Sequence, residues 1–211
     1  MSIAPPRISR LRLGPQSAGL LLTPREFDRA RFEEGWRYEL INGVLVVSPI
    51  PLPEERDPNE ELGYWLRQYR DAHPQGSTLD ATLAEHEIET GPNRRRADRV
   101  IWAGLGRDPG EGEAPTVVAE FVSSGKVDQE RDCIAKRAEY REAGVRQYWV
   151  IDRFRRTLTV YDFRGEKDEE QLIPEGKTFE TPLLPGFVLD LKRLLAFADR
   201  GAKKKRRGKK P

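Results

Sequence analysis

The sequence predicts an α/β (α+β) fold in which a mixed β-sheet core is flanked by helices. Three observations lead to this prediction: a strand–helix–strand segment at 114–152, three strand-like runs in succession, and an amphipathic helix ahead of them. In chain order, the core elements are expected at 59–72 (helix), 79–90, 97–102 and 116–121 (strands), 128–143 (helix) and 146–152 (strand). Consecutive strands tend to pair antiparallel and a crossover adds a parallel neighbour, so the sheet is mixed.

Ahead of this core, the sequence predicts a short helix and a hairpin. Thr23 and Glu26 have the spacing of a capping box with Pro24 at the first helical position, so a helix should run to about Glu34. Asn42-Gly43 separates two β-rich runs, and this dipeptide favours a two-residue hairpin turn. The strands of the hairpin are expected at 37–41 and 44–48.

A proline-rich stretch at 49–58 is expected to be a loop before the first core helix. That helix has its apolar residues on one side, namely Leu62, Trp65, Leu66 and Tyr69. In the crossover, Thr116–Phe121 is a mostly apolar run typical of a strand buried on both faces. Asp128 is a candidate N-cap and Gly144 a candidate C-cap for the crossover helix. A strand at 157–163 and a helix at 191–199 complete the pattern.

The length of 211 residues fits one domain with two tails. We expect a disordered leader at 1–19, a folded domain at 20–200 and a disordered basic tail at 201–211. The single cysteine, Cys133, excludes an internal disulfide and a cysteine-based zinc cluster. No apolar stretch approaches the length needed to cross a membrane, so no membrane association is expected and the cytoplasm is the expected location.

The basic tail dominates the net charge of +2. It contains seven basic and no acidic residues, so the other 30 basic residues face 35 acidic ones and residues 1–200 carry about −5. Such a tail either contacts nucleic acid or is a solvated end that keeps the protein soluble. The candidate nucleic-acid contacts are Lys203, Lys204, Lys205, Arg206 and Arg207.

Two carboxylates stand out in the predicted strands. Glu120 interrupts the apolar run 116–121, where a buried charge is costly unless it is paired. Asp98 opens the run 97–102, although aspartate is depleted in strands. A structural salt bridge for Glu120 and a turn-capping role for Asp98 are one interpretation. The other is that the strands are neighbours and the two carboxylates together hold a hard cation such as Mg²⁺.

The sequence gives little support for zinc, nucleotide or serine hydrolase chemistry. His73 and His86 have no partner at metal-ligand spacing, so zinc is not expected. The chain has none of the glycine-rich nucleotide motifs and no G-x-S-x-G, which leaves nucleotide hydrolysis, dinucleotide binding and serine hydrolase activity unsupported. Lys136 shares a helix sector with Tyr140, and it either extends along the surface to reach water or points at the carboxylates.

Several phrases of the sequence, in order, resemble the PD-(D/E)XK nuclease superfamily and, within it, the Uma-type restriction endonuclease family. They are RYELING at 37–43, ADRVI at 97–101, VVAEFVS at 117–123, KRAEY at 136–140, AGVRQYWVID at 143–152 and PGF at 185–187. The resemblance covers roughly residues 20–200 and implies a restriction-endonuclease-like core of αβββαβ order. It also implies a metal-dependent endonuclease that hydrolyses phosphodiester bonds in DNA.

The resemblance assigns a role to each candidate residue. Asp98 and Glu120 would hold Mg²⁺, or Mn²⁺ in its place, with the backbone carbonyl of Phe121. The superfamily's lysine two residues after the glutamate is replaced by Val122, and Lys136 in the following helix matches the position used in this family. Glu39 matches a further family position and either joins the site or forms a salt bridge in the hairpin.

Some features depart from the family pattern: Ala97 replaces a proline, Ser124 replaces another, and a histidine of the early helix is missing. The alternative interpretation is therefore a nuclease fold without activity that binds DNA or a protein partner. The resemblance also allows a homodimer, since enzymes that cut both strands generally pair two sites.

Overall fold

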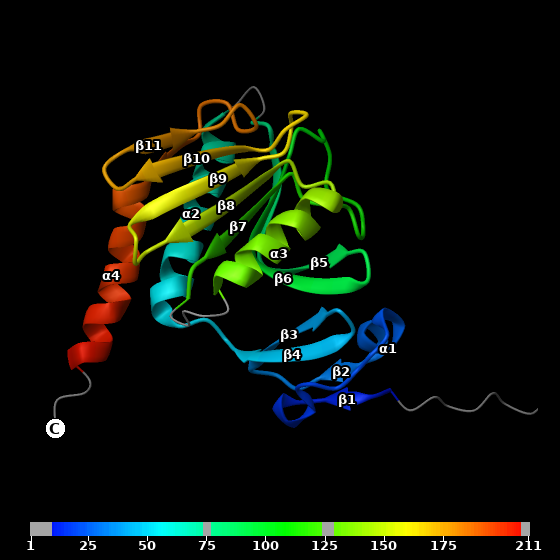
Figure 1. The fold of residues 1–211 in the computed structure, drawn as a ribbon. Helices are drawn as coiled ribbons and strands as arrows, with labels where there is room; N and C mark the ends of the chain where they lie inside the picture. Colours follow the sequence, from blue (N-terminus) through cyan, green and yellow to red (C-terminus); the bar gives the residue numbers. More distant parts are fainter. Residues whose placement is uncertain (1–9, 74–76, 124–128, 208–211) are drawn as a thin grey trace, which may run out of the picture. The chain divides into compact units, whose positions relative to one another are not determined.

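The computed structural model describes residues 10–73, 77–123 and 129–207, and Figure 1 shows the order of the elements along the chain. The chain divides into two compact units. The smaller unit contains residues 1–50 and 91–96, and the larger unit contains residues 51–90 and 97–211. In the described part of the chain, no helix has the length and apolar character needed to span a bilayer.

The larger unit is built on a mixed sheet in the order β10-β9-β8-β7-β6, with β5 also paired to β6. The parallel pair is β7–β8, and β6–β7, β8–β9 and β9–β10 are antiparallel. The predicted αβββαβ order and the parallel crossover are therefore confirmed. The strands are β5 (Leu79–Thr90), β6 (Asn93–Ala103), β7 (Val117–Phe121), β8 (Gln147–Asp152), β9 (Thr157–Asp162) and β10 (Glu169–Pro174).

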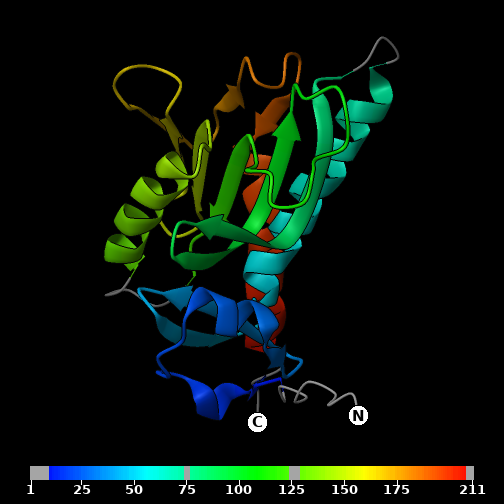
Figure 2. The ribbon, with the colours of Figure 1, turned by 90° about the vertical axis from the view of Figure 1, so that its right-hand side faces the viewer.

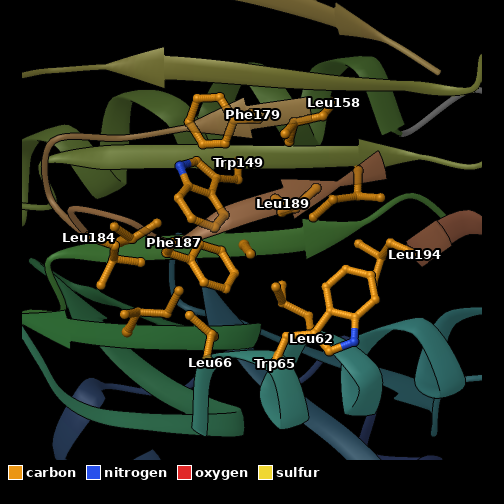
Figure 3. Packing of buried hydrophobic residues seen from close by; sticks show 14 of the residues in the cluster. Leu62, Trp65, Leu66, Trp149, Leu158, Phe179, Leu184, Phe187, Leu189 and Leu194 are labelled. Atoms are coloured by element: carbon orange, nitrogen blue, oxygen red, sulfur yellow. The ribbon is translucent and has the colours of Figure 1, made fainter. Parts of the chain in front are cut away.

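Helices cover both faces of this sheet. Figures 1 and 2 show α3 (Gln129–Glu142) on one face, and α2 (Pro53–Ala72) and α4 (Leu191–Arg207) on the other. Apolar side chains of α2 and α4 form one core cluster with the sheet, as Figure 3 shows. A short antiparallel pair, β11 (Thr178–Glu180) and β12 (Val188–Asp190), adds to this layer, and Phe179 meets the Trp149 ring edge-on at 5.3 Å.

The periodic apolar residues of α2 explain why it packs here. Leu62, Leu66 and Tyr69 follow helical spacing and are buried. Burying each such side chain contributes about 1.5–3 kcal/mol, so Leu66→Ala would cost about 2–5 kcal/mol. The helix begins at Pro53, whereas a loop was expected as far as Pro58. That expectation was wrong because Pro53 stands at the first helical position, and the helix continues through Pro58 although a proline there removes one backbone hydrogen bond.

The smaller unit contains a hairpin and a short parallel strand pair. Its elements are β1 (Arg12–Leu13), a 3-10 helix (Pro15–Ser17), α1 (Pro24–Arg29), β2 (Arg31–Phe32), β3 (Trp36–Ile41) and β4 (Val44–Pro49). Asn42 and Gly43 both have positive φ, as the predicted two-residue turn requires. The hairpin joins the first residues of β6 through Leu40 and Arg94.

Two features near the N-terminus differ from the sequence prediction. The capping box of Thr23 and Glu26 is present, but α1 ends at Arg29 rather than near Glu34. The reason is that the chain leaves the helix at Ala30, which is extended, and β2 pairs in parallel with β1. Folded structure therefore begins inside the expected leader, at Arg12, and residues 1–9 lie outside the described part.

Candidate functional site

Asp98 and Glu120 lie on neighbouring antiparallel strands of the larger unit. The register pairs Val100 with Val118 and Arg99 with Ala119, so Asp98 and Glu120 follow at the next opposed position. Val100 and Val118 belong to the cluster that faces α3. Because side chains alternate along a strand, Asp98 and Glu120 share that face. Both are buried, with 5% and 9% of their surface exposed.

The Asp98 side chain is fixed against β7. Its Oδ2 accepts a hydrogen bond of 2.7 Å from the backbone N–H of Phe121, the residue after Glu120. The Asp98 carbonyl accepts a second bond, also 2.7 Å, from the Asn59 side-chain amide on α2. Asp98 is thus held from both sides of the sheet, and its carboxylate is brought to the C-terminal end of β7.

Helix α3 supplies two donors to the other carboxylate. Lys136 Nζ lies 3.1 Å from Glu120 Oε1, and the Tyr140 hydroxyl donates to the same oxygen at 2.9 Å. The two donors are one helical turn apart and therefore project from the same side of α3. Lys136 is buried, with 8% of its surface exposed. A buried ammonium group is costly unless a partner compensates its charge, and here Glu120 does so.

This donor set fits a hard cation. Carboxylate and carbonyl oxygens are the ligands that Mg²⁺ prefers, and two carboxylates with one backbone carbonyl leave positions for water and substrate oxygens. The described residues contain no group of three or more His, Cys, Asp or Glu side chains arranged for a metal. The arrangement therefore offers an oxygen-rich pair with an adjacent ammonium group, which is suited to chemistry on an anionic substrate.

The profile of the Uma2 family, described as "Putative restriction endonuclease", matches residues 24–192, well over half of the chain. The chain belongs to the Uma2 family.

The Uma2 chain also resembles a solved structure. A crystal structure of a putative nuclease belonging to DUF820 from Anabaena variabilis superposes with a TM-score of 0.65 at 16% identity. The match covers 84% of this chain and 99% of that one. At this identity, the likeness shows a common fold. A comparison with curated proteins gives no match.

The remaining candidate residues of this Uma2 chain belong to other elements. Glu39 belongs to the smaller unit, where it accepts a hydrogen bond of 3.1 Å from the Arg96 backbone N–H. The candidate nucleic-acid residues 203–207 fall in the last turns of α4, and the structure does not describe their side chains. Residues 208–211 and the candidate cap Asp128 lie outside the described residues.

Sequence reasoning missed the support behind Asp98. On the opposite face, Arg99 Nε donates to the Asn59 carbonyl at 3.1 Å and to its side-chain oxygen at 2.7 Å. The guanidinium lies over Gly63, where an added Cβ would come within 2.5 Å of Arg99 Nη1. Burial lowers the pKa of Arg99 to about 10, although Glu60 opposes this shift, so the group stays charged at neutral pH. An arginine in a buried strand and a glycine inside an amphipathic helix were the available signals.

Proposed function

We propose that this Uma2 chain is a Mg²⁺-dependent endonuclease that hydrolyses phosphodiester bonds in DNA, with Mn²⁺ as a substitute metal. The observation that carries the proposal is the pairing of two buried carboxylates, Asp98 and Glu120, with Lys136 donating to one of them. Two buried carboxylates on adjacent strands repel each other, and a cation between them relieves that repulsion. The family match to restriction endonucleases supports DNA as the substrate.

The proposed reaction assigns each group one task. Asp98, Glu120 and the Phe121 carbonyl would hold the metal, which supplies Lewis-acid stabilisation of charge on the phosphate when it is bound. An ammonium group has three N–H donors, so Lys136 can hold Glu120 and also orient the attacking water. Tyr140 keeps Glu120 Oε1 in place while Lys136 engages the substrate.

The test is nicking of supercoiled plasmid by the purified full chain with Mg²⁺ and with EDTA. Asp98→Asn and Glu120→Gln keep the size of each side chain and remove its charge, so both should lose cleavage and bind Mn²⁺ more weakly in calorimetry. Glu142→Gln is the matched control because this carboxylate is exposed at the end of α3. It should cut as the wild type does.

The same assay separates this proposal from the inactive-module alternative. A wild-type protein that binds DNA but leaves the plasmid intact with either metal would favour a binding module. Wild-type cleavage by Glu120→Gln would overturn the assignment of the site.

A further inference from the structure

The smaller unit has an unusual set of charges. Its described residues, 10–50 and 91–96, contain no lysine. They contain nine arginines against five acidic residues, although residues 1–200 as a whole are acidic. The excess positive charge of this unit is therefore carried entirely by guanidinium groups.

Strand pairing places two of these arginines side by side. The register of the parallel pair β1–β2 sets Arg12 opposite Arg31, at the strand spacing of about 5 Å. Both side chains are exposed. Like charges directly opposite one another on a sheet are destabilising, so this pair costs stability unless an anion lies against it.

More arginines lie close along the chain. Arg10 and Arg29 each precede a member of the pair by two residues, and both are exposed. Arg29 is in the last turn of α1, directly before β2. We call Arg10, Arg12, Arg29 and Arg31 the arginine cluster.

Three of the five acidic residues in the described part of this unit are engaged with other groups. Asp28 forms an ion pair with Arg94 at 2.8 Å, Glu26 closes the capping box of α1, and Glu39 accepts from a backbone N–H. Glu33 and Glu34 are exposed after β2. Within the described residues, no carboxylate lies within ion-pair distance of the arginine cluster.

We propose that the arginine cluster binds the phosphate backbone of nucleic acid. A guanidinium group matches a phosphate with two parallel N–H donors, and it is more weakly hydrated than an ammonium group. A phosphate bridging Arg12 and Arg31 also removes their mutual repulsion, so binding and relief of strain act together. DNA is the partner because the same chain carries the proposed phosphodiesterase site, and in this the inference rests on the proposed function.

The experiment measures DNA binding without cleavage. Anisotropy of a labelled duplex is recorded in EDTA with the full chain over a range of KCl concentrations. Each phosphate neutralised adds about −0.9 to the slope of log K against log salt, so Arg12→Ala/Arg31→Ala should flatten the slope by at most about 1.8. Between 50 and 200 mM salt, the wild type should then lose about tenfold more affinity than the variant.

A matched variant removes the same charge elsewhere. Arg67 and Arg146 are exposed residues of the larger unit, and Arg67→Ala/Arg146→Ala should leave the slope unchanged. An equal flattening by both double variants means that net charge alone matters, which would overturn the proposal.

An anionic lipid surface is the competing partner, because Leu11 in the same segment is an exposed apolar side chain. Loss of binding to phosphatidylserine vesicles with unchanged DNA binding would also overturn it.

Two further measurements keep a folding defect from being mistaken for lost binding. Because Arg12 and Arg31 repel each other, their removal should not lower the thermal midpoint. If the thermal midpoint does fall, the variant Arg12→Lys/Arg31→Lys restores both positive charges and should restore the salt slope of DNA binding. A slope that stays flat in this lysine variant would overturn the proposal. Since the binding measurement is made in EDTA and involves no cleavage, plasmid nicking tests the proposed function separately.

Discussion

Replacing Lys136 with methionine should destabilise the metal-free protein. The ammonium group lies 3.1 Å from Glu120 Oε1, and both side chains are only 11% exposed. Methionine keeps much of the stem but leaves Glu120 in the sheet without this cation. Removing one partner of a buried ion pair typically costs about 3–5 kcal/mol.

This magnitude can be measured. For a chain of this length, 1 kcal/mol shifts the thermal midpoint by about 2–4 °C, so a loss of about 3 kcal/mol lowers it by about 6–12 °C in EDTA. Adding Mn²⁺ should recover much of this loss, because a metal bound to the folded state compensates Glu120 and stabilises by mass action. Lys192→Met, at an exposed position on α4, is the control and should stay within about 0.5 kcal/mol of the wild type.

A double-mutant cycle isolates the pair itself. Glu120→Gln leaves Lys136 buried without its carboxylate, whereas the double variant Glu120→Gln/Lys136→Met contains neither charge. The double variant should therefore lose less stability than the two single variants together, with a coupling of about 1–3 kcal/mol from urea unfolding in EDTA. Strict additivity, or an unchanged midpoint for Lys136→Met, would show that the ion pair does not stabilise the fold and refute this reasoning.

Three further predictions concern other parts of the chain. Truncation after Arg200 should flatten the salt dependence of DNA binding if the basic tail contacts phosphates; an unchanged slope makes the tail a passive end. Burial alone would raise the pKa of Asp162, but hydrogen bonds led by those from Arg164 lower it to about 2 from 3.8. Because the pKa of Asp162 is lowered on folding, the stability that it contributes is present above pH 3.8 and is lost as the pH falls through about 2, so the urea midpoints of the wild type and Asp162→Asn should converge there. Gly63→Ala should lower the thermal midpoint, since its Cβ would meet Arg99 at 2.5 Å, and overpacking costs about 1–3 kcal/mol; a raised midpoint contradicts this.

The central elements were predictable because their signals are local. Six core elements follow from apolar periodicity, and the parallel crossover follows from chain connectivity. Asp98 and Glu120 were recognisable because a carboxylate in an apolar strand is costly and needs a reason. The structure places both on one face of the sheet, as neighbouring strands require.

The remaining features depend on contacts between residues far apart in the sequence. α1 ends early because β2 pairs with β1. β10 follows a charged stretch, and no local sequence pattern predicts that β10 pairs with β9. Asn59 reads as a helix-start residue, yet it links α2 to the Asp98 carbonyl and to Arg99. Tyr140 reads as a core aromatic, and only the fold shows that its hydroxyl reaches Glu120.

The position of Lys136 makes the geometry of the candidate site depend on how α3 docks. Val122 directly follows β7, and it packs against the apolar cluster under α3. The ammonium group beside Glu120 comes from α3, and two further side chains of this helix lie against tyrosine rings of the sheet. Tyr140 meets the Tyr148 ring edge-on at 5.3 Å, and Arg137 lies 4.3 Å from the Tyr161 ring centre. Because the same tyrosine docks the helix and donates to Glu120, a shift of α3 would change the positions of both Lys136 and Tyr140 relative to this carboxylate.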